Sequence, residues 1–396
     1  MKAVTWQGKR NVSVDNVPDP TIQEPTDAII RVTSTAICGS DLHLYEILGP
    51  YMAKGDILGH EPMGIVEEVG SAVTNLKVGD RVVIPFNISC GHCFMCTHGL
   101  QSQCETTQVH EHGSGAALLG YSSLYGSVPG GQAEYLRVPF ADYGPVKVGS
   151  ELPDERYLYL SDILPTAWQG VQYADVPKDG VLAVYGLGPV GQFVARIGRY
   201  LGHRVIAVEP VAERREMAER HGIETMDFTD GTVEELRSMT DGRGPDAVVD
   251  AVGMEAHGSP GGYFAQQAVG VLPDKLAQKV METAGRDRVS VLHSAVDAVR
   301  RGGTLSLSGV YGGTATPMPL LTMFDKQIQV RMGQCNVRRW TDELLPIVEE
   351  PSDPLGVMDL MTHEVPIDDA PAAYENFQKK TDGTIKVVLK PQGLSV

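Results

Sequence analysis

A glycine-rich turn between a predicted strand and a predicted helix constrains the fold of this chain more than any other feature. An apolar run at 181–185 leads directly into Gly186-Leu187-Gly188-Pro189-Val190-Gly191, and a helical stretch follows over 192–200. Glycines at these positions permit a tight turn, close approach to a pyrophosphate and packing of the helix on the strand, while the helix N-terminus faces the anion. The pattern predicts a dinucleotide-binding βαβ unit. An ordinary glycine-rich turn is the alternative.

Further apolar strands are predicted at 204–208, 247–250, 304–308 and 328–332. They alternate with helical stretches, which is typical of a doubly wound parallel sheet. The first third of the chain differs, because its short β-branched runs at 28–33, 64–70 and 80–85 are bounded by Gly, Pro, Asp and Asn. That pattern predicts an antiparallel, barrel-like β domain. A strand-like run at 384–389 could rejoin this first domain.

An acidic residue closes the strand that follows the glycine turn. Glu209 stands eighteen residues after Gly191. A carboxylate there accepts hydrogen bonds from ribose hydroxyls and repels a 2′-phosphate, so the sequence favours NAD over NADP. Arg214, one helical turn further on, could stack on adenine or bind a 2′-phosphate, and it weakens this preference.

Four of the six cysteines lie within fifteen consecutive positions, with the spacing Cys90-x2-Cys93-x2-Cys96-x7-Cys104. Four thiolates suit a closed tetrahedral zinc site, which has no open position for chemistry and contributes folding free energy. Unligated thiols or a redox pair are the alternative.

A second possible metal site is scattered along the chain. Cys38, Ser40 and His43 offer a thiolate, a hydroxyl and an imidazole, while His60 and Glu61 offer an imidazole beside a carboxylate. A catalytic zinc takes such mixed ligands and needs three from the protein plus an open position. Taken singly, Cys38 could instead be a core thiol and His60 a buried structural histidine.

Charge and composition exclude several partners. The chain has 396 residues with 50 acidic and 33 basic side chains, a net charge of −17, so nucleic acid and anionic membranes would be repelled. No uncharged run is long and unbroken enough to span a bilayer. The first nine residues lack the apolar core of a signal peptide, and the few cysteines fit a reducing compartment. We therefore expect a cytoplasmic protein without nucleic-acid or membrane partners.

Together these motifs resemble the zinc-dependent medium-chain alcohol dehydrogenase family over nearly the whole chain. The resemblance implies an α/β protein with a GroES-like β-barrel catalytic domain at 1–163 and 334–396, and a Rossmann coenzyme domain at 164–333. It implies a homodimer or homotetramer with two zinc ions per chain and NAD. Cys38 and His60 would be ligands of the catalytic zinc and Glu61 a carboxylate beside it. Asp41 would orient His60, and Ser40 and His43 would form a proton relay.

One departure from the family pattern concerns the third ligand of the catalytic zinc. The family usually has a cysteine just before the coenzyme domain, but the matching stretch at 160–166 has none and offers Asp162. An aspartate there resembles the glutathione-independent formaldehyde dehydrogenase and formaldehyde dismutase branch. Carboxylate is a harder ligand than thiolate and leaves more positive charge on zinc, so a bound oxygen should be more acidic. The alternative is a surface turn aspartate.

A second departure is the length of the segment between the predicted strand at 247–250 and Gly302, about twice that of a simple crossover. The extra residues, about 254–291, resemble the insertion that covers the adenine side of the coenzyme in formaldehyde dehydrogenases. Our hypothesis is that this segment slows NAD release. Packing or subunit contact is the alternative role.

The resemblance implies hydride transfer between NAD and a small alcohol or a hydrated, formaldehyde-like aldehyde. An ordinary secondary-alcohol or polyol dehydrogenase with freely exchanging NAD is the alternative, and a zinc-free reductase of the same superfamily would lack the Cys38, His60 and Asp162 set. Further coenzyme contacts are expected at Gly39, Ser40, His43, Thr166, His257, Gly309, Val310, Gln334 and Lys386. Candidates for substrate contact are Leu44, Tyr45, Ile47, Tyr121 and Trp168.

Overall fold

The computed structural model describes residues 1–253, 290–311 and 318–393. The chain forms two compact units, one made of Met1–Pro165 with Cys335–Val396 and the other of Thr166–Gln334. These limits lie next to the domain boundaries expected at 163/164 and 333/334. The predicted insertion at 254–291 lies outside the described residues, apart from its last two positions.

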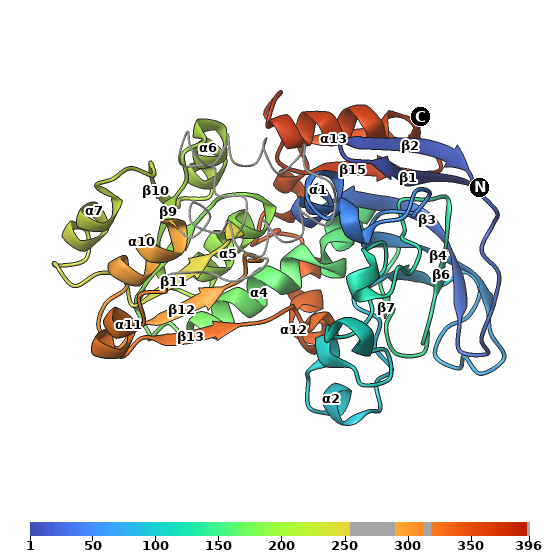
Figure 1. The fold of residues 1–396 in the computed structure, drawn as a ribbon, viewed down its shortest axis with the longest axis horizontal. Coiled ribbons are helices and arrows are strands. Elements are labelled where there is room, and N and C mark those ends of the chain that lie inside the picture. The colour runs from blue at the N-terminus through green and yellow to red at the C-terminus, as the bar shows by residue number, and fades with distance from the viewer. Residues whose placement is uncertain (254–289, 312–317, 394–396) are drawn as a thin grey trace. The chain divides into compact units, whose positions relative to one another are not determined.

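The second unit is built on a parallel sheet with the strand order β10-β9-β8-β11-β12-β13 (Figure 1). Every pairing in it is parallel, as the alternation of strands and helices predicted. Its elements, in chain order, are β8 (Val181–Tyr185), α5 (Pro189–Tyr200), β9 (Arg204–Val208), α6 (Ala212–Arg220), β10 (Glu224–Met226), α7 (Thr232–Ser238), β11 (Ala247–Asp250), α10 (Ser290–Ala298), β12 (Thr304–Leu307), α11 (Leu320–Lys326) and β13 (Gln329–Met332).

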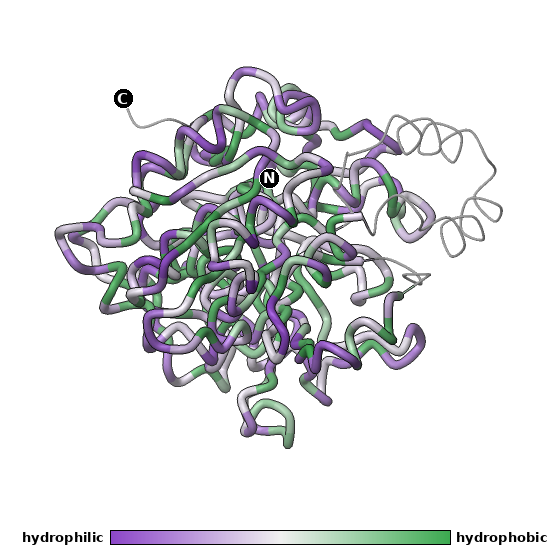
Figure 2. The backbone as a smooth tube through the Cα atoms, turned by 90° about the vertical axis from the view of Figure 1, so that its left-hand side faces the viewer, coloured by the Kyte–Doolittle hydropathy of each residue, from purple (hydrophilic) through white to green (hydrophobic). Residues whose placement is uncertain are grey.

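Helices cover the central strands of this sheet, because β8, β9, β11 and β12 are buried at most positions. Alternate strand residues such as Ala183, Ile206 and Val248 pack with Leu236 of α7 and Ala295 of α10 in one buried cluster. Helix α5 packs against β8 and β9. In Figure 2 hydrophobic and hydrophilic stretches alternate along the backbone.

The first unit holds a larger, mainly antiparallel sheet with the order β14-β15-β3-β4-β5-β7, to which β6 adds beside β3, and a two-stranded sheet of β1 and β2. Its elements are β1 (Lys2–Gly8), β2 (Asn11–Asn16), β3 (Ala28–Ile37), α1 (Gly39–Glu46), η1 (Gly49–Tyr51), β4 (Glu61–Val69), β5 (Arg81–Val83), α2 (Phe94–Thr97), η2 (Gln101–Gln103), η3 (His110–His112), η4 (Ser123–Tyr125), β6 (Tyr135–Val138), β7 (Val146–Lys147), α3 (Asp154–Tyr157), η5 (Leu158–Ser161), α4 (Ile163–Ala174), α12 (Val337–Glu349), η7 (Val357–Leu360), β14 (His363–Pro366), η8 (Ile367–Asp369), α13 (Ala370–Lys379) and β15 (Val387–Lys390). The chain passes into the second unit within α4.

The tail completes the sheet of the first unit. In β15, Val387 pairs antiparallel with Ile37 of β3, and Ala36 of β3 pairs with Glu61 of β4. The register of three strands far apart in the sequence therefore brings Lys386, Cys38 and Glu61 to the same end of the sheet.

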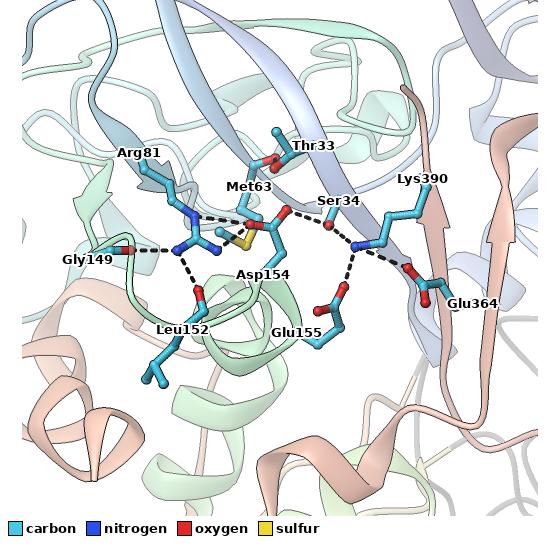
Figure 3. Close-up of polar contacts among 10 residues, drawn as sticks. All are labelled: Thr33, Ser34, Met63, Arg81, Gly149, Leu152, Asp154, Glu155, Glu364 and Lys390. Atoms are coloured by element: carbon cyan, nitrogen blue, oxygen red, sulfur yellow. Dashed lines mark hydrogen bonds and ion pairs between the residues drawn. The ribbon is translucent and has the colours of Figure 1, made fainter. Parts of the chain in front are cut away.

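A network of charged side chains fixes α3 against this sheet (Figure 3). Arg81 of β5 donates from Nε to Asp154 Oδ1 over 3.1 Å, and Ser34 Oγ of β3 donates to Asp154 Oδ2 over 2.7 Å. Burial would raise the pKa of Asp154, but hydrogen bonds from Thr33, Arg81 and Ser34 hold it below its ordinary value.

The tail strand joins the same network. Lys390 of β15 donates to Ser34 Oγ over 2.8 Å, is ion-paired with Glu155 of α3, and lies 3.3 Å from Glu364 of β14. Three strands thereby hold α3, which leads through η5 directly to Asp162.

Candidate metal centres and coenzyme site

The four-cysteine loop folds into one compact cluster. The Sγ atoms of Cys90, Cys93, Cys96 and Cys104 all lie within 4.8 Å of one another. Cys93 is the N-cap of α2 and accepts from the amide of Cys96, while the amides of Cys90 and Cys93 donate to Cys104 Sγ and Cys90 Sγ over 3.4 Å. Backbone N–H groups aimed at sulfur stabilise thiolates.

The electrostatics of the loop fit a bound zinc ion. Burial raises the pKa of the Cys104 thiol, but hydrogen bonds from Cys90 and Thr107 lower it to about 6. The pKa of Cys93 is also lowered, against burial, by hydrogen bonds from Cys96 and Glu105. Burial raises the pKa of Cys96 instead, so the hydrogen bonds favour the thiolate at two of the four positions. Four converging sulfurs match a closed structural zinc site.

A second cluster forms at the end of the main sheet of the first unit. Cys38 follows β3 and is the N-cap of α1. His60 precedes β4, Glu61 begins it, and Asp162 follows η5. One ligand atom from each of the four residues lies within 4.8 Å of the others, and all four are buried. The structure therefore brings together the residues that the sequence suggested as catalytic zinc ligands.

Asp162 completes the set of three expected ligands. Its Oδ2 lies 3.4 Å from Cys38 Sγ and 3.4 Å from His60 Nε2. Only 8% of Asp162 is exposed, so it is not the surface turn aspartate that was the alternative. One thiolate, one imidazole and one carboxylate form a mixed set that suits zinc with a position left for substrate.

Asp41 orients the imidazole of His60. The Nδ1 atom of His60 lies 3.0 Å from Asp41 Oδ1, while Asp41 Oδ2 accepts from the amide of Cys38 at 2.9 Å and from Gln132 at 3.2 Å. Tyr374 in turn donates to Gln132 over 2.8 Å. Burial would lower the pKa of His60, but Asp41 and Cys38 raise it well above its ordinary value. With Nδ1 held by Asp41, Nε2 is directed at Asp162.

The cluster favours a cation. Burial, assisted by Glu61 and Asp162, raises the pKa of the Cys38 thiol to about 12. A metal ion among these groups would offset the cost of ionising the thiol in such a buried place. The donor set therefore fits the zinc that the sequence implied.

Lys386, which the sequence suggested for contact with the coenzyme pyrophosphate, is paired with a carboxylate of the second cluster. Its side chain is fully buried, and Nζ is bonded to Glu61 at 2.6–2.7 Å. Burial would lower the pKa of Lys386, but Glu61 and Cys38 raise it. The contact of Lys386 with the coenzyme pyrophosphate stays a prediction. Sequence spacing gave no signal for the pair, which lies 325 residues apart in the chain.

The expected relay residues share one helix. Ser40 and His43 lie three positions apart on α1, which Gly39 begins, and therefore on one helix face. Ser40 Oγ lies 3.0 Å from His60 Nε2, beside the predicted ligands. His43 is buried, with 8% of it exposed.

Two aromatic rings pack against the imidazole of His60. Phe86 and Tyr121 approach it edge-on, with ring centroids 6.2 and 6.1 Å from the imidazole. Tyr121 was a candidate for substrate contact, whereas Phe86 was missed because an aromatic residue after a strand carries no specific signal.

In the second unit the glycine turn has the geometry that a dinucleotide needs. A Cβ atom on Gly191 would lie 1.9 Å from the carbonyl oxygen of Gly186, so only glycine allows this helix to start so close to the strand. Helix α5 begins at Pro189, and its N-terminus provides the partial positive charge that binds phosphate.

The side chain of Glu209 is hydrogen-bonded to the backbone around this turn. Its Oε2 accepts from the amide of Leu187 at 2.7 Å and its Oε1 from the amide of Val211 at 2.9 Å. Arg214 lies 3.7 Å from the same carboxylate, so the two charges partly compensate each other. Each carboxylate oxygen can accept a further hydrogen bond, which leaves Glu209 able to bind a ribose.

The other residues suggested for coenzyme contact are dispersed. Gly309 follows β12 and donates its amide to the carbonyl of Asp250 over 2.8 Å, and the neighbouring Val310 is 55% exposed. Gln334 accepts from Gln169 at its backbone carbonyl, and Thr166 lies on α4. His257 lies outside the described residues.

Comparison with known proteins gives the family. Residues 24–148 match the alcohol dehydrogenase GroES-like domain and residues 189–258 the zinc-binding dehydrogenase model. An uncharacterized zinc-type alcohol dehydrogenase-like protein of Bacillus subtilis, AdhB, is 44% identical over 99% of this chain and 100% of its own length. The chain belongs to the zinc-type alcohol dehydrogenase family. The predicted family and fold class are confirmed.

Two further relatives bear on specificity. The glutathione-independent formaldehyde dehydrogenase of Pseudomonas aeruginosa is 33% identical over 99% of this chain and 98% of its own. The solved structure of the alcohol dehydrogenase TADH from Thermus sp. ATN1 is 32% identical, covers 98% of this chain and 99% of its own, and superposes with a TM-score of 0.81. The chain is therefore an oxidoreductase of the zinc-type family. Among the helices of the described ranges, none has the length and hydropathy that a bilayer crossing requires.

Proposed function

We propose that this zinc-type dehydrogenase uses NAD to oxidise a small alcohol or the hydrate of a small, formaldehyde-like aldehyde. The observation that carries the proposal is the buried cluster of Cys38, His60 and Asp162, in which a carboxylate would supply the third ligand. The formaldehyde dehydrogenase of Pseudomonas aeruginosa is a relative over nearly the full length of the chain.

In the proposed mechanism Cys38, His60 and Asp162 hold the catalytic zinc and the four-cysteine loop holds a second, structural one. When bound, the catalytic zinc acts as a Lewis acid that makes a substrate hydroxyl more acidic. Ser40 Oγ accepts the proton that this hydroxyl loses, and His43 takes it onward along α1. Asp41 holds the His60 ring in place throughout.

The coenzyme is proposed to be NAD. Glu209 is buried, lies beside the glycine turn and is negatively charged, and such a group disfavours the extra phosphate of NADP. The nearby Arg214 is paired with Glu209, which lowers its availability for a 2′-phosphate. By the family resemblance we propose a cytoplasmic homodimer or homotetramer.

An ordinary alcohol dehydrogenase with freely exchanging NAD is the second candidate. The similarity to the Thermus alcohol dehydrogenase, at nearly the same identity as the formaldehyde dehydrogenase, favours it. The two candidates differ in whether the coenzyme leaves the enzyme between turnovers.

Quantifying nucleotide in freshly purified protein tests the proposal. The protein is denatured without added coenzyme, and released NAD(H) and NADP(H) are measured per chain by mass spectrometry. Near one NAD(H) per chain, with turnover of formaldehyde, supports a held coenzyme and makes aldehyde dismutation feasible. No bound nucleotide, with activity on secondary alcohols only when NAD is added, supports the second candidate. Activity with neither substrate class in zinc-replete protein refutes both.

A further inference from the structure

Tyr121 occupies a place beside the candidate zinc site that the mechanism above does not use. Its ring stands nearly perpendicular to the His60 imidazole, at 82° and 6.1 Å between centroids. The ring of a second tyrosine, Tyr125, packs edge-on against Tyr121, with 5.6 Å between the ring centroids. Tyr121 also lies against the apolar cluster that includes Leu44 and Leu58.

The backbone before Tyr121 is fixed against the residues of the site. A Cβ atom on Gly120, which has φ +58°, would lie 2.3 Å from the carbonyl oxygen of Gly59, the residue before His60. The amide of Leu119 donates to the carbonyl of Phe86 over 3.0 Å, and that of Gly120 to Val128 over 2.8 Å. Two neighbours of the site, Gly59 and Phe86, thus hold the loop that carries Tyr121 in place.

The hydroxyl of Tyr121 is the polar part of this otherwise apolar wall. Tyr121 is only partly buried, and across the ranges 1–253, 290–311 and 318–393 no residue forms a hydrogen bond with its hydroxyl. A phenol hydroxyl can donate one hydrogen bond and accept another. A donor held beside the metal ligands and lacking a protein partner is suited to a ligand oxygen.

We propose that the Tyr121 hydroxyl donates a hydrogen bond to a second hydroxyl of the substrate, next to the one that is oxidised. The second hydroxyl is geminal in an aldehyde hydrate and vicinal in a 1,2-diol, and it is absent from a simple alcohol. Tyr121 is then the residue that selects two-oxygen substrates over simple alcohols. This inference rests on the proposed function, because it assigns a substrate class to the same site.

The test compares wild-type enzyme with Tyr121→Phe on three substrates: formaldehyde, ethylene glycol and 1-propanol, the last being close to ethylene glycol in size. The variant should lose about tenfold in kcat/KM for a two-oxygen substrate relative to 1-propanol, as expected for one hydrogen bond, mainly through KM. A drop with formaldehyde alone assigns the geminal hydroxyl, and a drop with ethylene glycol alone assigns the vicinal one. Tyr125→Phe, on the same loop but without a contact to the His60 ring, is the matched control and should keep the wild-type ratios.

An equal loss on all three substrates, or no loss on any, would overturn the role of Tyr121, because a purely structural tyrosine would not discriminate among them. A second readout is independent of turnover: the thermal midpoints of the zinc-loaded proteins with ethylene glycol and with 1-propanol. Ethylene glycol should raise the thermal midpoint of Tyr121→Phe by less than it raises that of wild-type protein. An equal rise in both proteins would contradict the inference. If wild-type enzyme oxidises none of the substrates, the proposed function fails, and the thermal measurement still decides for or against Tyr121.

Discussion

Replacing Asp162 tests the candidate zinc site at its least usual residue. Asp162→Ala removes the carboxylate that lies 3.4 Å from both Cys38 Sγ and His60 Nε2. The rest of the cluster keeps its support, because Asp41 still orients His60. Asp162→Cys instead places a thiolate, the usual third ligand of the family, at the same position.

The magnitude follows from the number of ligands. Four-ligand structural zinc sites bind with about 10–16 kcal/mol, so one ligand contributes on the order of 3 kcal/mol. Such a loss corresponds to about a hundredfold weaker zinc binding. Asp162→Ala should therefore lose the catalytic zinc on dialysis and its activity with it. The four-cysteine loop contains no part of this cluster and should keep its metal.

Metal analysis by inductively coupled plasma mass spectrometry gives the decisive number. Wild-type protein is expected to hold two zinc ions per chain, Asp162→Ala one, and Asp162→Cys two. Cys104→Ala is the converse control, because it should lose the structural zinc and destabilise the fold. If Asp162→Ala kept two zinc ions through dialysis, Asp162 would not be a ligand, and the proposed third position would be wrong.

Two other predictions concern stability and coenzyme choice. Asp154→Asn should lower the free energy of unfolding by about 2 kcal/mol at pH 7, because Arg81 loses its charged acceptor. Since folding lowers the pKa of Asp154, its contribution is present above the ordinary value of about 4 and is lost as the pH falls through the lowered value. Urea unfolding should therefore show that the difference in the free energy of unfolding between wild type and Asp154→Asn is smaller at pH 3 than at pH 7. The exposed Asp241→Asn is the control. An equal difference at both pH values would contradict the reasoning. Glu209→Gln should raise the ratio of kcat/KM with NADP to kcat/KM with NAD at least tenfold. Glu224→Gln, on the exposed edge of the same sheet, is the control and should leave this ratio unchanged. An unaltered ratio in Glu209→Gln would show that Glu209 does not select the coenzyme.

The fold could be predicted well where hydrophobic runs are long. Strands β8, β9 and β11 have the bounds that their apolar runs indicated, since each is buried on both faces. Strand β10, Glu224–Met226, was missed because a three-residue edge strand with one buried position has no apolar run to detect. In the first unit β3 extends to Ile37, beyond the run that suggested it, because β15 from the tail pairs with its end.

The site could be predicted only in part, and the missing residues share a cause. The four cysteines are close in sequence, so their spacing alone indicates a zinc loop. The support of His60 through Asp41, Gln132 and Tyr374 spans most of the chain, and glutamine and tyrosine have no motif that marks them. The pairing of Lys386 with Glu61 could not be predicted, because it arises only from strand register.

The position of Asp162 illustrates how a catalytic geometry depends on residues that no motif marks. Asp162 is not on a regular strand or long helix; it follows the short segments α3 and η5, which have little stability of their own. The charged network of Arg81, Asp154 and Lys390 anchors α3 to three strands, and the carbonyl of Ser161 accepts from the amide of Phe86. A metal ligand held in this way is placed by the sheet as a whole. We therefore expect a change in that network to loosen zinc at Asp162 before it unfolds the unit.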